Sequence, residues 1–186
     1  MRALRAVVPW LLLAVGLVSG PVGAAPPSSV ITWTQSSLLG IAESTRLKLL
    51  SYLAQGDIAG ALAYYEIQTG HQAPDWLRNL QVAYSVTNQA AGKCQEVART
   101  LHTAFTKLGQ TTQYVGIRAL QNKDYIAFDM ATGKSPGITH NGYHVIVMVE
   151  DKVYDAFTGP LGMKLTDYLS RLHAEFGVSW KVVPAP

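Results

Sequence analysis

The residues most able to do chemistry lie in segment 88–98, which holds the only cysteine of the chain, Cys94. From Cys94 onward apolar residues recur at helical spacing until Gly109, so the pattern predicts a helix that begins at the cysteine. The unpaired N–H groups and partial positive charge of a helix N-terminus favour a thiolate and can receive an oxyanion. Lys93 adds a second positive neighbour. Cys94 is therefore the candidate nucleophile.

A cysteine nucleophile needs a base, and that base needs a third group that fixes its tautomer and orientation. The histidines of the chain are His71, His102, His140, His144 and His173. His102 lies two turns beyond Cys94 on the predicted helix, about 12 Å away along the axis, which is too far for a hydrogen bond. His144 opens the most apolar predicted strand and is the candidate base. A satisfied core or edge histidine is the alternative role for this residue.

The third group is Asp155, a carboxylate inside the otherwise apolar segment 153–157. An ionised group is costly there unless it has a partner. If Glu150 and Asp151 form a two-residue hairpin loop, Asp155 lies one diagonal step from His144. If the loop starts one residue later, Asp155 lies about 13 Å from His144 along the strand. The triad therefore depends on this register, and a carboxylate bonded to a nearby turn is the alternative role for Asp155.

Helical patterns precede the cysteine and alternating patterns follow it. Amphipathic patterns over residues 34–54, 57–70 and 74–84 predict helices in the front part of the chain. Strands are predicted over residues 113–119, 125–130, 142–149, 153–157 and 178–183, with an amphipathic helix from Thr166 or Asp167 through His173. Helices first and an antiparallel sheet after them predict an α+β domain with the cysteine helix packed on the sheet.

The first 24 residues have the pattern of a secretory signal peptide. Arg2 and Arg5 form its positive region, an apolar run follows, and small residues up to Ala24 provide a cleavage site. The run is short and soon broken, which argues against stable membrane insertion, with an uncleaved anchor as the alternative. Residues 25–33 are the predicted linker. Residues 34–186 fit a single domain with a helical front part over 34–90 and a catalytic core over 91–186, located outside the cell or in the periplasm.

The charge and the motifs of the chain argue against several classes of partner and cofactor. Part of the net charge of +3 belongs to Arg2 and Arg5, and the remainder shows no run of like charge, which argues against nucleic acid as a partner. The sequence has no CxxC or HExxH spacing and no glycine-rich phosphate loop after a predicted strand, so no metal or other cofactor is expected. A lone cysteine in an exported protein indicates intermolecular pairing or a reactive thiol. Burial beside Val97 and Leu101 is the structural alternative for Cys94.

Three segments carry a family resemblance in their order along the chain. They are GKCQEVA (92–98) at a helix start, NGYHV (141–145) on a strand and VYD (153–155) on the next strand. Together they resemble the papain-fold toxin families of bacterial polymorphic toxins, a circularly rearranged branch of the papain-like cysteine peptidases. The resemblance covers roughly residues 88–172. It implies a papain-like fold with the family's cysteine at Cys94, its histidine at His144 and its acidic residue at Asp155.

The resemblance also implies an oxyanion donor ahead of the cysteine, and Gln89 or Asn88 could fill that place. Such toxin domains usually end long multidomain proteins, whereas here a signal peptide pattern and a helical front part precede the domain. This departure weakens the toxin role more than the triad.

The expected function is that of an exported cysteine-triad enzyme that acts on amide bonds through a thioester. It would hydrolyse a peptide bond, or deamidate or transamidate a glutamine side chain. A protein or peptide is the expected substrate, and an inhibitor or immunity protein is a further expected partner. The alternative is a non-catalytic binding or inhibitory module on the same fold, in which Cys94 is structural.

Overall fold

The computed structural model describes residues 41–186. The predicted signal peptide and linker lie outside the described residues. Within residues 41–186, no helix is both long and apolar enough to cross a membrane.

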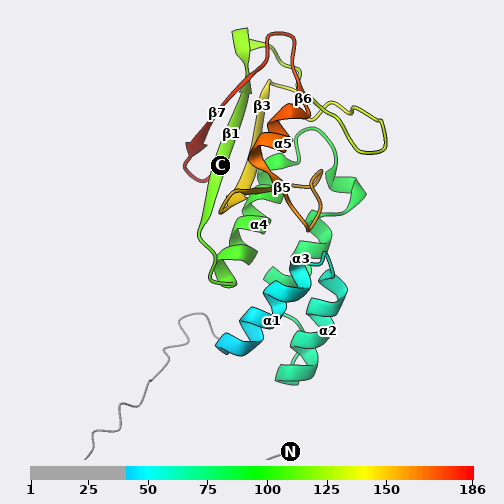
Figure 1. The fold of residues 1–186 in the computed structure, drawn as a ribbon, viewed down its shortest axis with the longest axis vertical. Helices are drawn as coiled ribbons and strands as arrows, with labels where there is room; N and C mark the ends of the chain where they lie inside the picture. Colours follow the sequence, from blue (N-terminus) through cyan, green and yellow to red (C-terminus); the bar gives the residue numbers. More distant parts are fainter. Residues whose placement is uncertain (1–40) are drawn as a thin grey trace, which may run out of the picture. The chain divides into compact units, whose positions relative to one another are not determined.

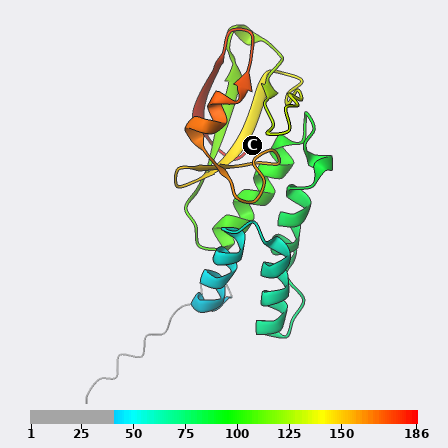
Figure 2. The same cartoon turned by 45° about the vertical axis from the view of Figure 1, so that its right-hand side comes forward.

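The front part contains the helices α1 (Glu43–Leu53), α2 (Ile58–Thr69) and α3 (Asp75–Ala83), within the ranges that the amphipathic patterns predict. The predicted helix 34–54 is described only from residue 41, and its residues 34–40 lie outside the described part of the chain. Asp57 begins α2 as a cap, because its carboxylate accepts a hydrogen bond of 2.7 Å from the backbone N–H of Gly60. Gly70 ends the same helix in the left-handed conformation. These helices gather at the lower end of the described part of the chain (Figures 1 and 2).

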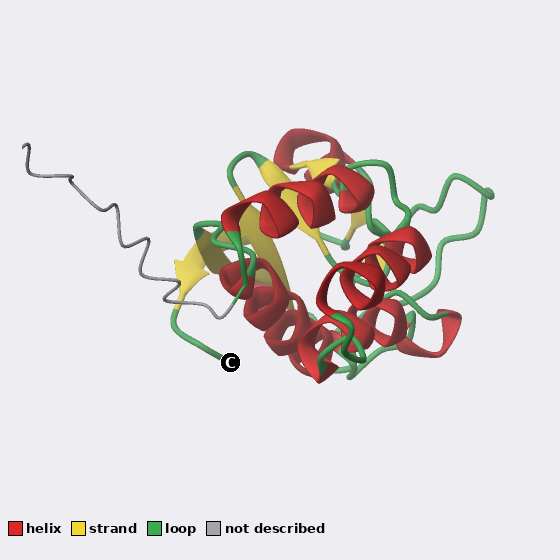
Figure 3. Cartoon of the chain, turned by 90° about the horizontal axis from the view of Figure 1, so that it is seen from below, coloured by secondary structure: helices red, strands yellow, loops and turns green. Residues whose placement is uncertain are grey.

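Helix α4 (Cys94–Lys107) follows and packs on a five-stranded sheet with the order β5-β4-β3-β1-β7. The strands are β1 (Thr112–Ala119), β3 (Tyr143–Val149), β4 (Lys152–Tyr154), β5 (Met163–Lys164) and β7 (Val178–Val183). All neighbouring strands run antiparallel. Figure 3, coloured by secondary structure, shows the long helices lying over the strands. The α+β architecture expected from the sequence is confirmed.

Three predicted elements differ from the structure. The predicted strand 125–130 is reduced to β2 (Ala127–Phe128), which pairs outside the main sheet with β6 (Leu172–His173). The helix predicted to run through His173 ends earlier, as α5 (Leu165–Ser170). Strand β4 stops at Tyr154, because the carboxylate of Asp155 accepts hydrogen bonds from the N–H groups of residues 157 and 158 and turns the backbone out of the sheet.

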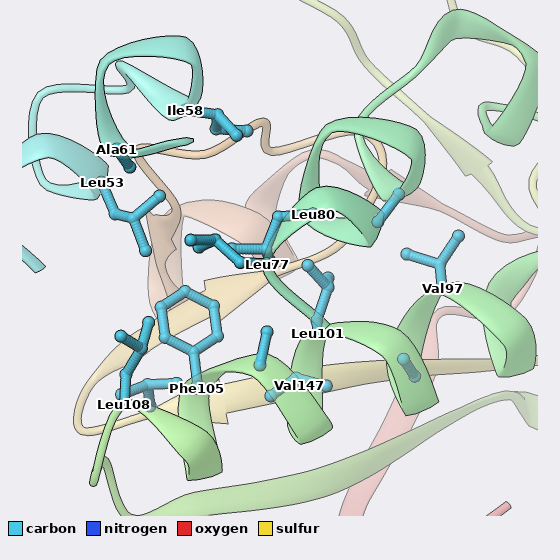
Figure 4. Close-up of a cluster of buried hydrophobic side chains, with 14 of the residues drawn as sticks. Leu53, Ile58, Ala61, Leu77, Leu80, Val97, Leu101, Phe105, Leu108 and Val147 are labelled. Carbon is cyan, nitrogen blue, oxygen red and sulfur yellow. The ribbon is translucent and has the colours of Figure 1, made fainter. Parts of the chain in front are cut away.

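Two apolar cores lie on the two faces of the sheet, because successive strand residues point to opposite faces. Val145, Val147 and Val149 face α4 and the front helices. Figure 4 shows part of this first core, which includes Leu77, Leu80, Leu101, Phe105 and Val147. Ile146 belongs to the second core, together with Tyr168 of α5. The sheet is therefore covered on both faces, and α4 is fixed against one of them.

Candidate active site

Cys94 is the first residue of α4, as the sequence predicts. A loop leads into it through Gly92, which adopts a φ of 86° that favours glycine. Lys93 is the N-terminal cap residue, and no cap hydrogen bond from its side chain is formed within the described part of the chain. Its ammonium instead contacts the carboxylate of Glu96 at 3.1 Å, and both side chains are largely exposed. Lys93 therefore adds little to the field at Cys94.

The sulfur of Cys94 lies beside an open edge of β3. Strand β4 pairs with β3 only as far as Tyr154 opposite Val147. Beyond this pair, the backbone N–H of Val145 interacts with the sulfur of Cys94. The N–H of Gln95 in the first turn of α4 interacts with the same sulfur. Because strand N–H groups lie in the plane of the sheet, the N-terminus of α4 faces the edge of β3.

These surroundings change the acidity of the thiol. Partial burial of Cys94 raises its pKa, but the His144 ring and the N–H groups of Val145 and Gln95 lower it by more. The net pKa of Cys94 is therefore below its ordinary value, and the thiolate is favoured. The same side chain also packs against the first apolar core, so reactivity and burial coexist at this position.

His144 and Asp155 meet as the hairpin register predicts. Val149 pairs with Lys152, which leaves Glu150 and Asp151 as the two-residue loop. The Nε2 atom of His144 lies 3.2 Å from Oδ2 of Asp155, and the two residues are only 2% and 3% exposed. The sequence therefore predicts the meeting of these two side chains correctly.

Asp155 is held in place by more groups than the sequence suggests. Its Oδ1 accepts hydrogen bonds of 2.8 Å from the backbone N–H groups of Phe157 and Thr158. Its Oδ2 accepts a hydrogen bond of 2.6 Å from the hydroxyl of Tyr168, a fully buried residue of α5. Sequence reasoning missed Tyr168, because the chain has nine tyrosines and their spacing does not show which one reaches a carboxylate. The turn role and the triad role of Asp155 are thus fulfilled by different oxygens.

The protonation of His144 follows from its two neighbours. Burial lowers the pKa of His144, but the hydrogen bond to Asp155 and the interaction with Cys94 outweigh burial and raise it to about 9. Nδ1 is buried and has no hydrogen-bond partner of good geometry among residues 41–186. Since Nε2 faces Asp155, Nδ1 is the ring nitrogen left for Cys94. An imidazolium beside a thiolate is the charge state that these contacts favour.

The two oxyanion candidates point in different directions. The side-chain amide of Asn88 donates a hydrogen bond of 2.7 Å to the carbonyl of Val82, toward the end of α3. The side-chain amide of Gln89 donates at 2.9 Å to the carbonyl of Ala156. Gln89 therefore ties the loop before Cys94 to the segment directly after Asp155. A primary amide has two N–H donors, so Gln89 keeps one for a ligand.

A surface cavity opens at Cys94. It has a volume of about 240 Å³, and its lining includes Gly92, Cys94, Gln95, His140 and Tyr143. His140 lines this cavity, whereas the buried residues His144 and Asp155 are not part of its lining. No group of three or more histidine, cysteine or acidic side chains among residues 41–186 is arranged to hold a metal ion. The cavity is thus an opening through which a substrate amide can reach the sulfur.

A family model described as papain fold toxin 2 matches residues 78–173. The matched range runs from α3 to β6 and includes Cys94, His144 and Asp155. No curated protein and no solved structure matches the chain.

Proposed function

The chain belongs to the papain fold toxin 2 family, and on this premise we propose that it is an exported cysteine-dependent enzyme that acts on amide bonds. In this proposal Cys94 is the nucleophile, His144 is the general base and acid, and Asp155 orients His144. The family match and the α+β architecture confirm the expected papain-like fold. The export step rests on the signal peptide pattern of residues 1–24.

One arrangement carries the proposal: the buried His144 ring faces the carboxylate of Asp155 with one nitrogen, leaves the other nitrogen unpaired among residues 41–186, and lowers the pKa of the Cys94 thiol. Nε2 faces the carboxylate of Asp155 at 3.2 Å, which fixes the proton on that nitrogen. Nδ1 is thereby left to exchange a proton with Cys94, whose pKa is lowered despite its burial. A structural cysteine needs neither a lowered pKa nor a histidine with an oriented ring.

The geometry supports a two-stage reaction. The Cys94 thiolate attacks the amide carbonyl, and the oxyanion that forms is stabilised by N–H groups in the first turn of α4 and by the second N–H of Gln89. His144 then gives its Nδ1 proton to the departing nitrogen, which leaves a thioester on Cys94. His144, now neutral, takes a proton from water as the water attacks the thioester. The acid leaves, and the thiolate and imidazolium are restored.

The departing nitrogen decides the type of reaction. A peptide bond releases a new amino terminus, whereas a glutamine side chain releases ammonia and becomes glutamate. An amine that replaces water in the second stage gives transamidation. All three follow from the same thioester, and the family description as a toxin favours a protein of another cell as the substrate. A producer of such a toxin needs a cognate inhibitor, so an immunity protein is the proposed partner.

A non-catalytic binding module is the second candidate, because Cys94 also packs against the first apolar core. Alkylation of the mature protein by iodoacetamide at a series of pH values separates the two. In an enzyme, the labelling rate rises at a pH below the pKa of a free thiol. The change His144→Ala moves this rise to higher pH. A rate that rises only above the ordinary thiol pKa, and that His144→Ala leaves unchanged, would support the binding module.

The reaction itself is identified by incubating the protein with a proteome and mapping new termini and Gln-to-Glu mass shifts. Cys94→Ser is the matched control, because it differs by a single atom. Modified sites that persist with Cys94→Ser would contradict the assignment of the nucleophile.

A further inference from the structure

A second cavity adjoins the cavity at Cys94. It has a volume of about 370 Å³, and its lining includes Gly116, Arg118, Tyr143, Trp180 and Lys181. Tyr143 also lines the cavity at Cys94. Tyr143 is therefore a lining residue common to the two cavities.

The side chain of Tyr143 packs closely over Gly116, a residue without a side chain. A Cβ atom at Gly116 would lie 2.9 Å from the hydroxyl oxygen of Tyr143 and 3.0 Å from a methyl carbon of Val183. Gly116 thus makes room for the phenol ring, which packs closely over the β1 backbone. The guanidinium of Arg118 lies 5.0 Å from the centroid of the same ring. This contact positions the cation at the wall of the second cavity.

Two cations border this cavity without a charged partner. Lys181 of β7 pairs with Gly116 of β1, and Arg118 lies two residues along β1. The two cations are therefore diagonal neighbours on one face of the sheet, with backbones about 7–8 Å apart. Within residues 41–186, neither side chain forms an ion pair. Neighbouring like charges repel each other, so an anion placed between them would be stabilised.

We propose that this second cavity binds an acidic stretch of the substrate polypeptide, next to the amide that is presented to Cys94. The proposal rests on the proposed function and adds a substrate class to it. A carboxylate accepts paired hydrogen bonds from a guanidinium and a further one from an ammonium. A polypeptide is favoured over a nucleic acid because the cavity adjoins a cysteine whose chemistry requires an amide. The enzyme accordingly selects amides that lie near Asp or Glu side chains.

Binding is tested on the full chain carrying Cys94→Ser, which cannot turn over a substrate. The probes are a fluorescein-labelled oligoglutamate and the matching oligoglutamine, followed by fluorescence anisotropy. Oligoglutamate is expected to bind about tenfold more tightly, with an affinity that falls as salt rises. The double change Arg118→Gln and Lys181→Gln should remove this difference.

A matched control lies at the opposite edge of the same sheet. Lys152 of β4 pairs with Lys164 of β5, so changing both to glutamine removes the same charge from a second pair of neighbouring cations. This control should keep the preference for oligoglutamate. Equal losses in both double variants would overturn the proposal, because they would show a general charge effect. Tighter binding of a single-stranded oligonucleotide, lost only in the Arg118 and Lys181 variant, would overturn it in favour of a nucleic acid.

Activity gives a readout that separates this proposal from the proposed function. Sites modified in a proteome should carry acidic residues near the reacting amide, and the Arg118 and Lys181 variant should lose this enrichment while it still modifies neutral sites. Modified sites without acidic enrichment would overturn the acidic substrate class and leave the enzyme assignment intact. Selective binding of oligoglutamate without any modified site would support the anion site and contradict the enzyme.

Discussion

The imidazole of His144 meets the carboxylate of Asp155 across the end of the β3–β4 hairpin, with 3.2 Å between Nε2 and Oδ2. Asp155 is the first residue after β4, so the chain is already leaving the sheet where the contact forms. The backbone N–H groups of Phe157 and Thr158 fix one carboxylate oxygen, and the other remains for His144 and Tyr168. The turn that ends the strand thus also orients the carboxylate.

Asp155→Asn should reduce activity by a factor of about 10 to 10⁴ while the fold is kept. An asparagine can donate to Nε2 and so stabilise the tautomer with the proton on Nδ1, which cannot accept a proton from Cys94. The measurement is kcat/KM, with circular dichroism as the check on folding. Asp129→Asn is the matched control, because Asp129 is an exposed carboxylate that contacts His173, and it should keep full activity. Full activity in Asp155→Asn with a loss of activity in Asp129→Asn would show that Asp155 is not the orienting carboxylate.

Turnover should depend on pH with a maximum below pH 9. On the acidic side, activity rises as the Cys94 thiol ionises, and it does so below the ordinary thiol pKa because that pKa is lowered. On the alkaline side, activity falls as pH passes the pKa of His144 of about 9, since His144 then loses the proton that it gives to the departing nitrogen. Steady-state rates against pH test this expectation. A rate that keeps rising beyond pH 10 would contradict the role of His144 as the acid.

Two tyrosines with buried hydroxyl groups provide a matched pair of stability changes. Tyr168→Phe removes the hydroxyl that donates a hydrogen bond of 2.6 Å to Asp155. This change should lower the free energy of unfolding by about 2 kcal/mol. The hydroxyl of Tyr84 is buried without a hydrogen-bond partner among residues 41–186. Tyr84→Phe should therefore be neutral or slightly stabilising. Urea unfolding of both variants provides the measurement, and equal losses would show that the hydrogen bond to Asp155 is not the cause.

Gly142→Ala should lower the free energy of unfolding by about 2 to 4 kcal/mol and also reduce activity. Gly142 has a φ of 66°, and a Cβ there would overlap the carbonyl oxygen of Lys123. The strain would be relieved by movement at the start of β3, two residues from His144. Gly133→Ala is the control, because Gly133 has a φ of 79° but open space around it, so only about 1 kcal/mol is expected. Thermal unfolding and kcat/KM distinguish the two effects.

The sequence predicts the positions of Cys94, His144 and Asp155 because each depends on a local pattern. A helix start places Cys94, and an apolar strand followed by a two-residue loop places His144 and Asp155 in register. The support around them is not local. Tyr168 reaches Asp155 from α5, and Gln89 reaches the carbonyl of Ala156, a contact that spans 67 positions of sequence. Strand pairing of β2 with β6 was missed for the same reason, since pairs this short have no periodicity to detect.

The open edge of β3 beside Cys94 has a consequence for solubility as well as for chemistry. A strand edge with unpaired backbone groups invites pairing with strands of other chains, and proteins cover such edges to avoid aggregation. Here the cover is the first turn of α4, and Val145 at the edge is fully buried. The turn that carries the nucleophile therefore also shields the sheet, so fraying of this one turn would expose an aggregation-prone edge at the moment it disabled the thiol.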